Sequence, residues 1–355
     1  MKTWDAVIIG GGIIGLSLSI ALRKLGLAVL VVERGEPGRE ASHAAAGMLV
    51  DCPLETPASL QPLATASARM YPEFVHELQD ESGLEVDLRD HGTLLFPTPE
   101  QLFARPRLMT DNPLPSPLAD LEPALASLQR SAMYLRERSV DPRLLTSAIL
   151  KAARHRGVDI SSGTAAMAVL LSNRRVAGVS TDKTTYPTRA VVNCAGAWAG
   201  KLPPPQLPVR PVKGQMLSVI GAPHNGLRHV IRAPEVYLVP RSDGRILIGA
   251  TVEEAGYDKR TDPHSIRTMH QAAVQLLPAL GQARVLEAWA GLRPGSPDNL
   301  PILGETETPG YFVASGHFRD GILLAPVTAH VMAQLVTGRR SEYDLAPFSP
   351  ARFQI

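Results

Sequence analysis

The sequence predicts an α/β protein whose chain opens with a strand, a helix and a second strand. The apolar run 6–9 leads directly into the glycine-rich turn 10–15. Helical spacing of apolar residues continues to about Leu25, and a second apolar run, 28–32, ends at Glu33. A glycine-rich turn between a strand and a helix, with an acidic residue about 20 positions later, is typical of a Rossmann-like dinucleotide-binding unit.

Each glycine of the turn has a separate physical role in such a unit. Gly10 permits the tight turn, Gly12 lets the backbone approach a pyrophosphate, and Gly15 lets the helix pack closely on the strand. The helix N-terminus presents unpaired N–H groups and a positive dipole end to the phosphates, and Glu33 can accept hydrogen bonds from a ribose hydroxyl. These residues predict a dinucleotide site; a purely structural unit without a ligand is the alternative that they leave open.

Composition argues against several other classes of protein. A chain of 355 residues is too long for one compact core, so we expect two domains. The net charge of +2 gives no reason to expect nucleic acid or an anionic membrane as a partner, and no apolar run reaches the length of about 18 residues that a membrane-spanning helix needs. Cys52 and Cys194 form no C-x-x-C pair and the ten histidines lack metal-ligand spacing, so we expect no disulfide, no metal and a cytoplasmic location.

The rest of the chain alternates between helical and strand patterns. Asp141 and Pro142 are predicted to begin a helix as N-cap and first helical residue, and Gly157 is predicted to end it. The predicted strand 189–194 runs into an Ala-Gly-Ala-Trp turn, another small-residue opening. Alternating apolar runs between 212 and 250 predict an antiparallel sheet. We therefore expect a second domain whose segments interleave with those of the first.

A final informative block, 314–326, joins a strand to a long C-terminal helix and contains a Gly-His-Phe-Arg run at 316–319. Together with the N-terminal turn, it resembles the D-amino-acid-oxidase superfamily of FAD enzymes, and within that superfamily glycine oxidase of the thiamin-biosynthesis type. The resemblance extends from Asp5 to about Gly338. The other matching segments are 44–49, 195–198, 210–216, 237–241, 249–253 and 291–295.

The resemblance implies a Rossmann-like FAD-binding domain of the glutathione-reductase-2 type and a second, substrate domain built on a mainly antiparallel sheet. It implies FAD held without a covalent bond, because no cysteine lies between Arg293 and His317. The helix that begins near Gly321 is expected to point its positive end at the flavin, where reduced flavin is anionic. The expected FAD-binding segments are 1–82, 140–203 and 289–355, and the expected substrate-domain segments are 83–139 and 204–288.

Many of the residues that the resemblance places against FAD are small, which suits close packing against a flat ligand. They are Gly10, Gly12, Ile13, Ile14, Gly15, Glu33, Arg34, Ser42, His43, Ala45, Ala46, Gly47, Met48, Ala166, Cys194, Ala195, Gly196, Trp198, Gly316, His317, Phe318, Arg319, Asp320, Gly321, Ile322 and Leu323. We expect His317 to contact the cofactor or order its loop rather than to remove a proton. Met48 lies near the flavin or substrate, or fills a gap in the core.

The resemblance also implies three catalytic residues, Arg293, Tyr237 and Arg319. A guanidinium fork matches a carboxylate in two hydrogen bonds, so Arg293 is expected to bind the substrate carboxylate together with the Tyr237 hydroxyl, and Arg319 to lie near substrate and flavin. A surface ion pair for Arg293, a plain strand position for Tyr237 and a backbone-carbonyl contact for Arg319 are the alternatives. No carboxylate is expected among these matched residues. Glu235 is the one candidate base, on the same strand face as Tyr237.

These features predict an enzyme that oxidises glycine, sarcosine or a small D-amino acid to an imine, which hydrolyses to a 2-oxo acid while oxygen becomes hydrogen peroxide. Two departures from the family's pattern leave the substrate open, because Glu235 stands in place of a histidine and Val252 in place of a methionine. A dehydrogenase that passes electrons to a carrier and an inactive flavin-binding subunit are the alternatives, although Arg293 and Tyr237 speak against the latter. The expected partners are the small substrate and oxygen, and a homo-oligomer stays open.

Overall fold

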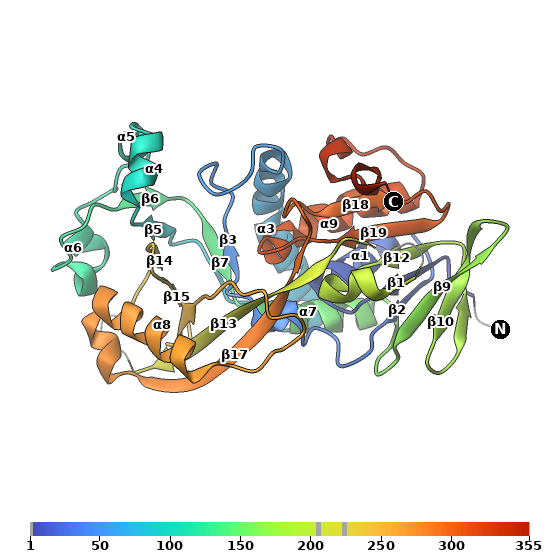
Figure 1. The fold of residues 1–355 in the computed structure, drawn as a ribbon, viewed down its shortest axis with the longest axis horizontal. Coiled ribbons are helices and arrows are strands. Elements are labelled where there is room, and N and C mark those ends of the chain that lie inside the picture. The colour runs from blue at the N-terminus through green and yellow to red at the C-terminus, as the bar shows by residue number, and fades with distance from the viewer. Residues whose placement is uncertain (1–2, 204–206, 222–225, 355) are drawn as a thin grey trace.

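The computed structural model describes residues 3–203, 207–221 and 226–354, and it contains two units, each built on a large sheet (Figure 1). The six-stranded sheet lies to the right in Figure 1, and the seven-stranded sheet with helix α8 lies to the left. The predicted domain boundary after residue 203 adjoins residues 204–206, which lie outside the described residues.

The six-stranded sheet has the order β18-β19-β12-β1-β2-β8, and its neighbours are parallel except that β18 pairs antiparallel with β19. Its strands are β1 (Ala6–Ile9), β2 (Val29–Val32), β8 (Asp159–Ser161), β12 (Val191–Asn193), β18 (Ile302–Glu305) and β19 (Tyr311–Ser315). Parallel strands need long crossover connections, which explains why this sheet gathers strands from distant parts of the chain. The predicted Rossmann-like parallel sheet is confirmed.

The central strand β1 buries side chains on both faces of this sheet. Ala6 and Ile8 pack with the helices on one face, whereas Val7 and Ile9 pack against a three-stranded sheet on the other. The helices are α1 (Ile13–Lys24), α3 (Gln61–Ser82), α7 (Pro142–His155) and α9 (Gly321–Val336), and the strands of the second layer are β9 (Ala166–Ser172), β10 (Arg175–Thr181) and β11 (Thr185–Pro187). Burial on both faces accounts for the unbroken apolar run of β1 in the sequence.

The second unit is a sheet in the order β17-β13-β16-β15-β14-β5-β6, in which β14 and β5 are parallel and the other described pairs are antiparallel. Its strands are β5 (Thr93–Leu95), β6 (Met133–Leu135), β13 (Arg210–Ile220), β14 (Val230–Arg232), β15 (Tyr237–Pro240), β16 (Ile246–Gly249) and β17 (Arg284–Gly295). Helix α8 (Pro263–Leu276) packs Met269 and Ala273 into the core of this unit. The predicted, mainly antiparallel sheet is confirmed.

The remaining elements of the described residues are short. They are β3 (Met48–Leu49), β4 (Leu88–Arg89), β7 (Arg138–Val140), α2 (Ala41–Ala44), α4 (Pro99–Ala104), α5 (Leu108–Asp111), α6 (Leu118–Leu121) and the 3-10 turns η1 (Pro123–Leu125), η2 (Gly196–Lys201), η3 (Pro278–Gln282), η4 (Ala346–Phe348) and η5 (Pro350–Phe353). None of the helices in the described ranges has the length and apolar character that crossing a membrane requires.

Two predicted domain boundaries fall inside strands. The boundary after residue 139 lies within β7, and the boundary after residue 288 lies within β17, which pairs with β13 along nearly its whole length. A continuous hydrogen-bonded ladder leaves no linker at either place. The division of the chain into five domain segments stays a proposal. At these two boundaries the chain continues within one strand from one proposed segment to the next.

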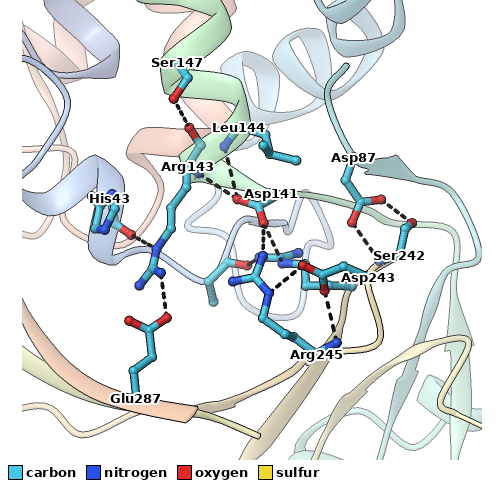
Figure 2. A network of polar contacts seen from close by, with 12 residues as sticks. His43, Asp87, Asp141, Arg143, Leu144, Ser147, Ser242, Asp243, Arg245 and Glu287 are labelled. Atoms are coloured by element: carbon cyan, nitrogen blue, oxygen red, sulfur yellow. Dashed lines mark hydrogen bonds and ion pairs between the residues drawn. The ribbon is translucent and has the colours of Figure 1, made fainter. Parts of the chain in front are cut away.

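Asp141 is the N-cap of α7 and also binds the second unit (Figure 2). Its Oδ1 atom accepts hydrogen bonds from the backbone N–H groups of Arg143, at 2.8 Å, and Leu144, at 3.2 Å, which confirms the predicted cap. Its Oδ2 atom accepts a hydrogen bond from Arg245, at 3.0 Å, in the turn between β15 and β16. One carboxylate therefore joins a helix of the first unit to a hairpin of the second.

Arg241 extends this network to the segment between α2 and β3. Its Nε atom lies 3.7 Å from Asp141 Oδ2, and its Nη2 atom donates a hydrogen bond of 2.6 Å to the carbonyl of Ala46. The Arg241 and Asp141 side chains are only 1% and 4% exposed. Burial lowers the pKa of Arg241 to about 10, although the Asp141 carboxylate opposes this shift. Arg241 is therefore a buried cation at neutral pH.

We expect Asp141→Ala to lower the free energy of unfolding by about 3–5 kcal/mol, because it leaves a buried guanidinium without its carboxylate. Asp262→Ala is the matched control, since Asp262 also precedes a proline and caps a helix through two backbone N–H groups, but is exposed. This control should cost only about 1 kcal/mol. Urea denaturation of both variants measures the difference, and equal losses would contradict a role for Asp141 beyond capping.

Candidate active site

One cavity of about 810 Å³ is lined by residues of both units. A volume in this range is typical of pockets that hold small-molecule ligands and cofactors. Its walls come from the turn between β1 and α1, the segment from α2 to β3, the end of β12, one face of the seven-stranded sheet and the start of α9. The predicted site residues therefore come together although their segments lie far apart in the sequence.

At one end of the cavity the turn between β1 and α1 presents bare backbone. Gly10 has a φ of +109°, and a side chain at Gly15 would clash with the carbonyl of Gly10, so both positions require glycine. The N-cap residue of α1, Gly12, has no side chain to cap the helix, and Ser42 Oγ accepts the N–H of Ile13 at 2.9 Å. The helix end thus keeps backbone N–H groups and a positive dipole beside the cavity.

The next part of the cavity lies at the end of β2. The Glu33 carboxylate accepts hydrogen bonds from the backbone N–H groups of Gly11 and Gly35, both at 2.8 Å. Carboxylate oxygens can each accept a further hydrogen bond, so the predicted contact with a ribose hydroxyl is compatible with this geometry. The Arg34 guanidinium lies 3.5 Å from the centre of the Trp198 ring. A stacked cation and aromatic ring bound the cavity here.

The opposite end of the cavity is a row of residues across the seven-stranded sheet. Directly paired residues on neighbouring strands point to the same face. The row, in order from β5 to β13, is Leu95, Arg232, Tyr237, Gly249 and Met216. All of these except Gly249 line the cavity. The sheet register therefore places the Tyr237 side chain on the cavity face.

Two glycines on this face make room for the predicted substrate-binding side chains. A side chain at Gly249 would clash with the Tyr237 hydroxyl, and one at Gly214 would clash with the Arg293 guanidinium. Tyr237 therefore lies across Gly249, with its hydroxyl 3.6 Å from Met216 Sδ, and Arg293 lies across Gly214. A glycine inside a strand marks this kind of close approach, so the sequence held a signal for both glycines that our interpretation missed.

Arg293 and Tyr237 both carry hydrogen-bond donors at this end. Arg293 Nη1 donates hydrogen bonds to the carbonyls of Thr251, at 3.1 Å, and Lys213, at 3.4 Å. Burial lowers the pKa of Arg293, and the nearby Arg319 cation lowers it as well. Burial raises the pKa of Tyr237 to about 12, so its hydroxyl keeps its proton at neutral pH. A guanidinium beside a hydroxyl donor is suited to a carboxylate ligand.

The loop before α9 places three ionisable side chains against the cavity. His317 is buried, with Nε2 3.1 Å from Thr328 Oγ1, and burial lowers its pKa to about 3. Arg319 is exposed and donates a hydrogen bond of 3.0 Å to the carbonyl of Glu55. Burial raises the pKa of Asp320 to about 6. His317 is therefore neutral at physiological pH, whereas Asp320 ionises near it.

Past Tyr237 the cavity continues into a part that the sequence interpretation missed, which we call the outer lobe. Arg232 binds two carboxylates there, Glu55 at 3.1 Å and the buried Glu137 at 2.8 Å. The residues that line the outer lobe are Glu55, Leu95, Phe96, Thr98, Gln101, Arg232, Ala233 and Pro234. Single charged residues scattered over the sequence carry no pattern, so only the fold brings this network together.

Most of the predicted cofactor-binding residues line the cavity. They are Gly10, Gly12, Ile13, Ile14, Glu33, Arg34, Ser42, Ala45, Ala46, Gly47, Met48, Ala166, Cys194, Ala195, Gly196, Trp198, His317, Phe318, Arg319, Asp320, Gly321 and Ile322. Gly15, His43, Gly316 and Leu323 are not among the lining residues. Gly15 faces the Gly10 carbonyl, Leu323 lies in the core beside the helices, and Gly316 faces Ile302.

The expectation about Glu235 as a candidate base is wrong. Glu235 does not share a face with Tyr237, because β15 begins only at Tyr237, and Glu235 is an exposed partner of Arg130 at 3.2 Å. Carboxylates do occur beside the predicted substrate site, since Glu55 and Asp320 both line the cavity. Glu235 is thereby removed as a candidate base.

Comparisons with known proteins agree with this architecture. The family model described as FAD dependent oxidoreductase matches residues 5–335. The chain is 34% identical over 359 residues to the glycine oxidase of Pseudomonas aeruginosa, covering 97% of this chain and 98% of that protein. It is 36% identical over 365 residues to the bifunctional protein ThiO/ThiG of Trichormus variabilis, covering 99% of this chain and 55% of that protein, so it spans about half the length of this bifunctional relative.

A solved structure extends the likeness to three dimensions. The crystal structure of glycine oxidase from Geobacillus kaustophilus matches this fold with a TM-score of 0.93 and 33% sequence identity, covering 99% of each chain. Sequence and structure agree over almost the whole chain, including every segment that lines the cavity. The chain belongs to the family of FAD-dependent oxidoreductases, and FAD is its cofactor.

Proposed function

We propose that this protein oxidises glycine or a similarly small amino acid to an imine, which hydrolyses to a 2-oxo acid, with oxygen as electron acceptor and hydrogen peroxide as second product. The observation that supports this most is the placement of the Arg293 guanidinium and the Tyr237 hydroxyl, each lying across a glycine on the cavity face of the sheet. The names of the relatives from P. aeruginosa and G. kaustophilus, both glycine oxidases, agree with it.

The shape of the cavity suits FAD. The glycine turn beside the N-terminus of α1 would hold the pyrophosphate, and Glu33 at the end of β2 would hold the ribose. Between the two ends, small residues line the cavity. Gly291 and Ala44 lie so close together that a side chain at Gly291 would clash with Ala44. When bound, FAD supplies the acceptor for the hydride that leaves the substrate's Cα.

The chain's own residues would bind and orient the substrate. The Arg293 fork would hold the carboxylate in two hydrogen bonds, and the Tyr237 hydroxyl, which keeps its proton, would donate another. Fixing the carboxylate at two side chains on one rigid sheet restricts the position of Cα. Such orientation is a major source of rate enhancement.

No side chain is needed as an obligatory base in this proposal. Only a neutral amine has a lone pair to assist the departure of hydride from Cα. His317 is neutral but is buried against Thr328, Glu235 is outside the cavity, and the carboxylates Glu55 and Asp320 that line the cavity take no part as bases in this proposal. The ionisation of the bound substrate amine would therefore control the rate.

A second candidate substrate is a larger amine, such as sarcosine or a small D-amino acid. Val252 lines the cavity yet is 69% exposed, and the outer lobe continues past Tyr237. Both features leave space for a substituent on Cα or on nitrogen. Peroxide release with glycine, sarcosine, D-alanine and D-proline would rank the candidates, and flavin reduction without peroxide would favour a dehydrogenase.

The purified protein should be yellow, and acid precipitation should release all of its FAD into the supernatant. Cys194 lines the cavity, but burial raises the pKa of its thiol, which keeps it protonated and unreactive. Absorbance of supernatant and pellet measures the distribution of flavin. Flavin retained in the pellet would contradict non-covalent binding, and Cys194→Ala would then test that residue as the attachment point.

Arg293→Ala should lower kcat/KM for glycine by roughly 30- to 5,000-fold, because losing one partner of a desolvated charge pair costs about 2–5 kcal/mol and about 1.4 kcal/mol is tenfold. Arg293→Lys should also be impaired, since an ammonium cannot reproduce the fork. FAD content should stay near normal in both. Arg260→Lys, at an arginine whose side chain is 88% exposed, is the control. If Arg293→Ala keeps activity within about threefold of the parent, another residue, first of all Arg319, binds the substrate carboxylate.

The rate of flavin reduction by glycine should rise with pH as the bound amine loses its proton. His317 should not contribute to this rise, because its pKa of about 3 leaves it neutral across the whole range above that value. Stopped-flow reduction should therefore show the alkaline rise in the parent, in His317→Gln and in the surface control Glu235→Gln. Loss of the rise in His317→Gln, with substrate still bound, would identify a protein base.

A further inference from the structure

Asp320 occupies the N-cap position of α9, but its carboxylate does not cap the helix. Asp141 and Asp262, the N-caps of α7 and α8, each accept hydrogen bonds from two backbone N–H groups of the first turn. Asp320, with φ of −100° and ψ of 7°, accepts none, and it lines the cavity. Asp320 therefore lies at the cavity, and its carboxylate leaves the first backbone N–H groups of its own helix unbonded.

Contacts from α3 hold the first turn of α9 in place. The Tyr71 hydroxyl donates a hydrogen bond to the carbonyl of Ile322, and Ser67 Oγ donates one of 2.6 Å to the carbonyl of Leu323. Tyr71 and Ser67 are both fully buried. The position of Asp320 is therefore set by the packing of two long helices.

Charged groups of several elements surround Asp320. Arg319 precedes it in the same loop, and Glu55 reaches it from the segment between β3 and α3. Arg232 on β14 binds Glu55, and Arg293 on β17 lies near Arg319. Burial raises the pKa of Asp320 to about 6, the Glu55 carboxylate raises it further, and Arg319 opposes both. Asp320 thus exchanges its proton close to neutral pH.

The charge of Asp320 matters because flavin becomes anionic when it is reduced. The positive end of a helix stabilises an anion, and an ionised carboxylate at that same end opposes it. A protonated Asp320 removes this repulsion. Reduction of the bound cofactor must therefore favour the protonated form of Asp320.

We propose that Asp320 binds one proton when the bound FAD is reduced, and so makes the reduction potential of this flavin depend more steeply on pH near neutrality. Two electrons from the reductant enter the flavin, and solvent supplies the additional proton to the carboxylate. The proposal rests on FAD as the occupant of the cavity and deepens the proposed oxidation by naming a group that links the flavin charge to proton uptake.

Two other ionisable groups facing this part of the cavity do not titrate in the same range. His317 has a pKa of about 3 and stays neutral, and Tyr237 has a pKa of about 12 and keeps its proton. Arg293 and Arg319 are guanidinium groups that line this part of the cavity. Glu55 is the remaining carboxylate, and Arg232 holds it in an ion pair at 3.1 Å.

The test is a dye-coupled redox titration of the FAD-loaded protein over about pH 5 to pH 8, without substrate. Above about pH 6 the parent should show a slope steeper by about 30 mV per pH unit, which is one extra proton for a two-electron couple. This steeper segment should be absent in Asp320→Asn and retained in Asp320→Glu and in the control Asp262→Asn. Sulfite adds to flavin N5 and leaves the ring anionic, so at neutral pH it should bind about tenfold more tightly to Asp320→Asn.

A steeper segment of equal size in Asp320→Asn would overturn the proposal. It would indicate that Glu55, and not Asp320, binds the additional proton. Equal sulfite affinity in parent and variant also overturns it. The N1 proton of the reduced flavin is followed separately in each variant, because neutral and anionic reduced flavin have different absorption spectra. Failure of this proposal can be told apart from failure of the proposed function. The dye titration uses no substrate, so it gives a result even when glycine does not reduce the flavin. Asp320→Ser supplies a second uncharged variant if Asp320→Asn loses FAD.

Discussion

The buried contact between Asp141 and Arg241 is the interaction on which the position of the active site most depends. Asp141 caps a helix that packs on the parallel sheet, and Arg241 belongs to the antiparallel sheet and binds the carbonyl of Ala46, which lines the cavity. Removing either side chain would take from a buried charge one of its ion-pair partners. This pair therefore fixes the relative placement of three walls of the cavity, and Arg245 reinforces it from the adjacent turn.

The two sheets contribute different chemistry to one cavity. In the parallel sheet, strand ends and a helix N-terminus meet at one edge, where backbone N–H groups suit phosphates. In the antiparallel sheet, side chains project in rows from a flat face, and glycines at 214 and 249 let Arg293 and Tyr237 lie along that face. A dinucleotide cofactor suits the first kind of surface and the carboxylate of the proposed substrate suits the second, so the proposed function draws on both units.

The substrate end combines cations and carboxylates in close proximity. Arg293 and Arg319 carry the positive charge that a substrate carboxylate would neutralise, and Glu55 and Asp320 lie on the same cavity wall. Arg232 compensates Glu55 from within the outer lobe. Of the three N-cap aspartates compared, Asp320 is the one whose side chain does not cap its helix. Its protonation is therefore sensitive to any charge that appears in the cavity.

The sequence alone determined the nucleotide-binding turn, the parallel strands around it, the antiparallel second sheet and the cap at Asp141, because each depends on local patterns of apolar residues, glycines and turn formers. The resemblance to known enzymes added Arg293, Tyr237 and Arg319, which the structure brings to one cavity. The tertiary structure alone decided that Glu235 points away, that Glu55 faces the cavity, and that Arg232 pairs with Glu55 and Glu137. These outcomes depend on strand register, on where each strand begins, and on contacts between residues up to 177 positions apart, and no local pattern encodes them.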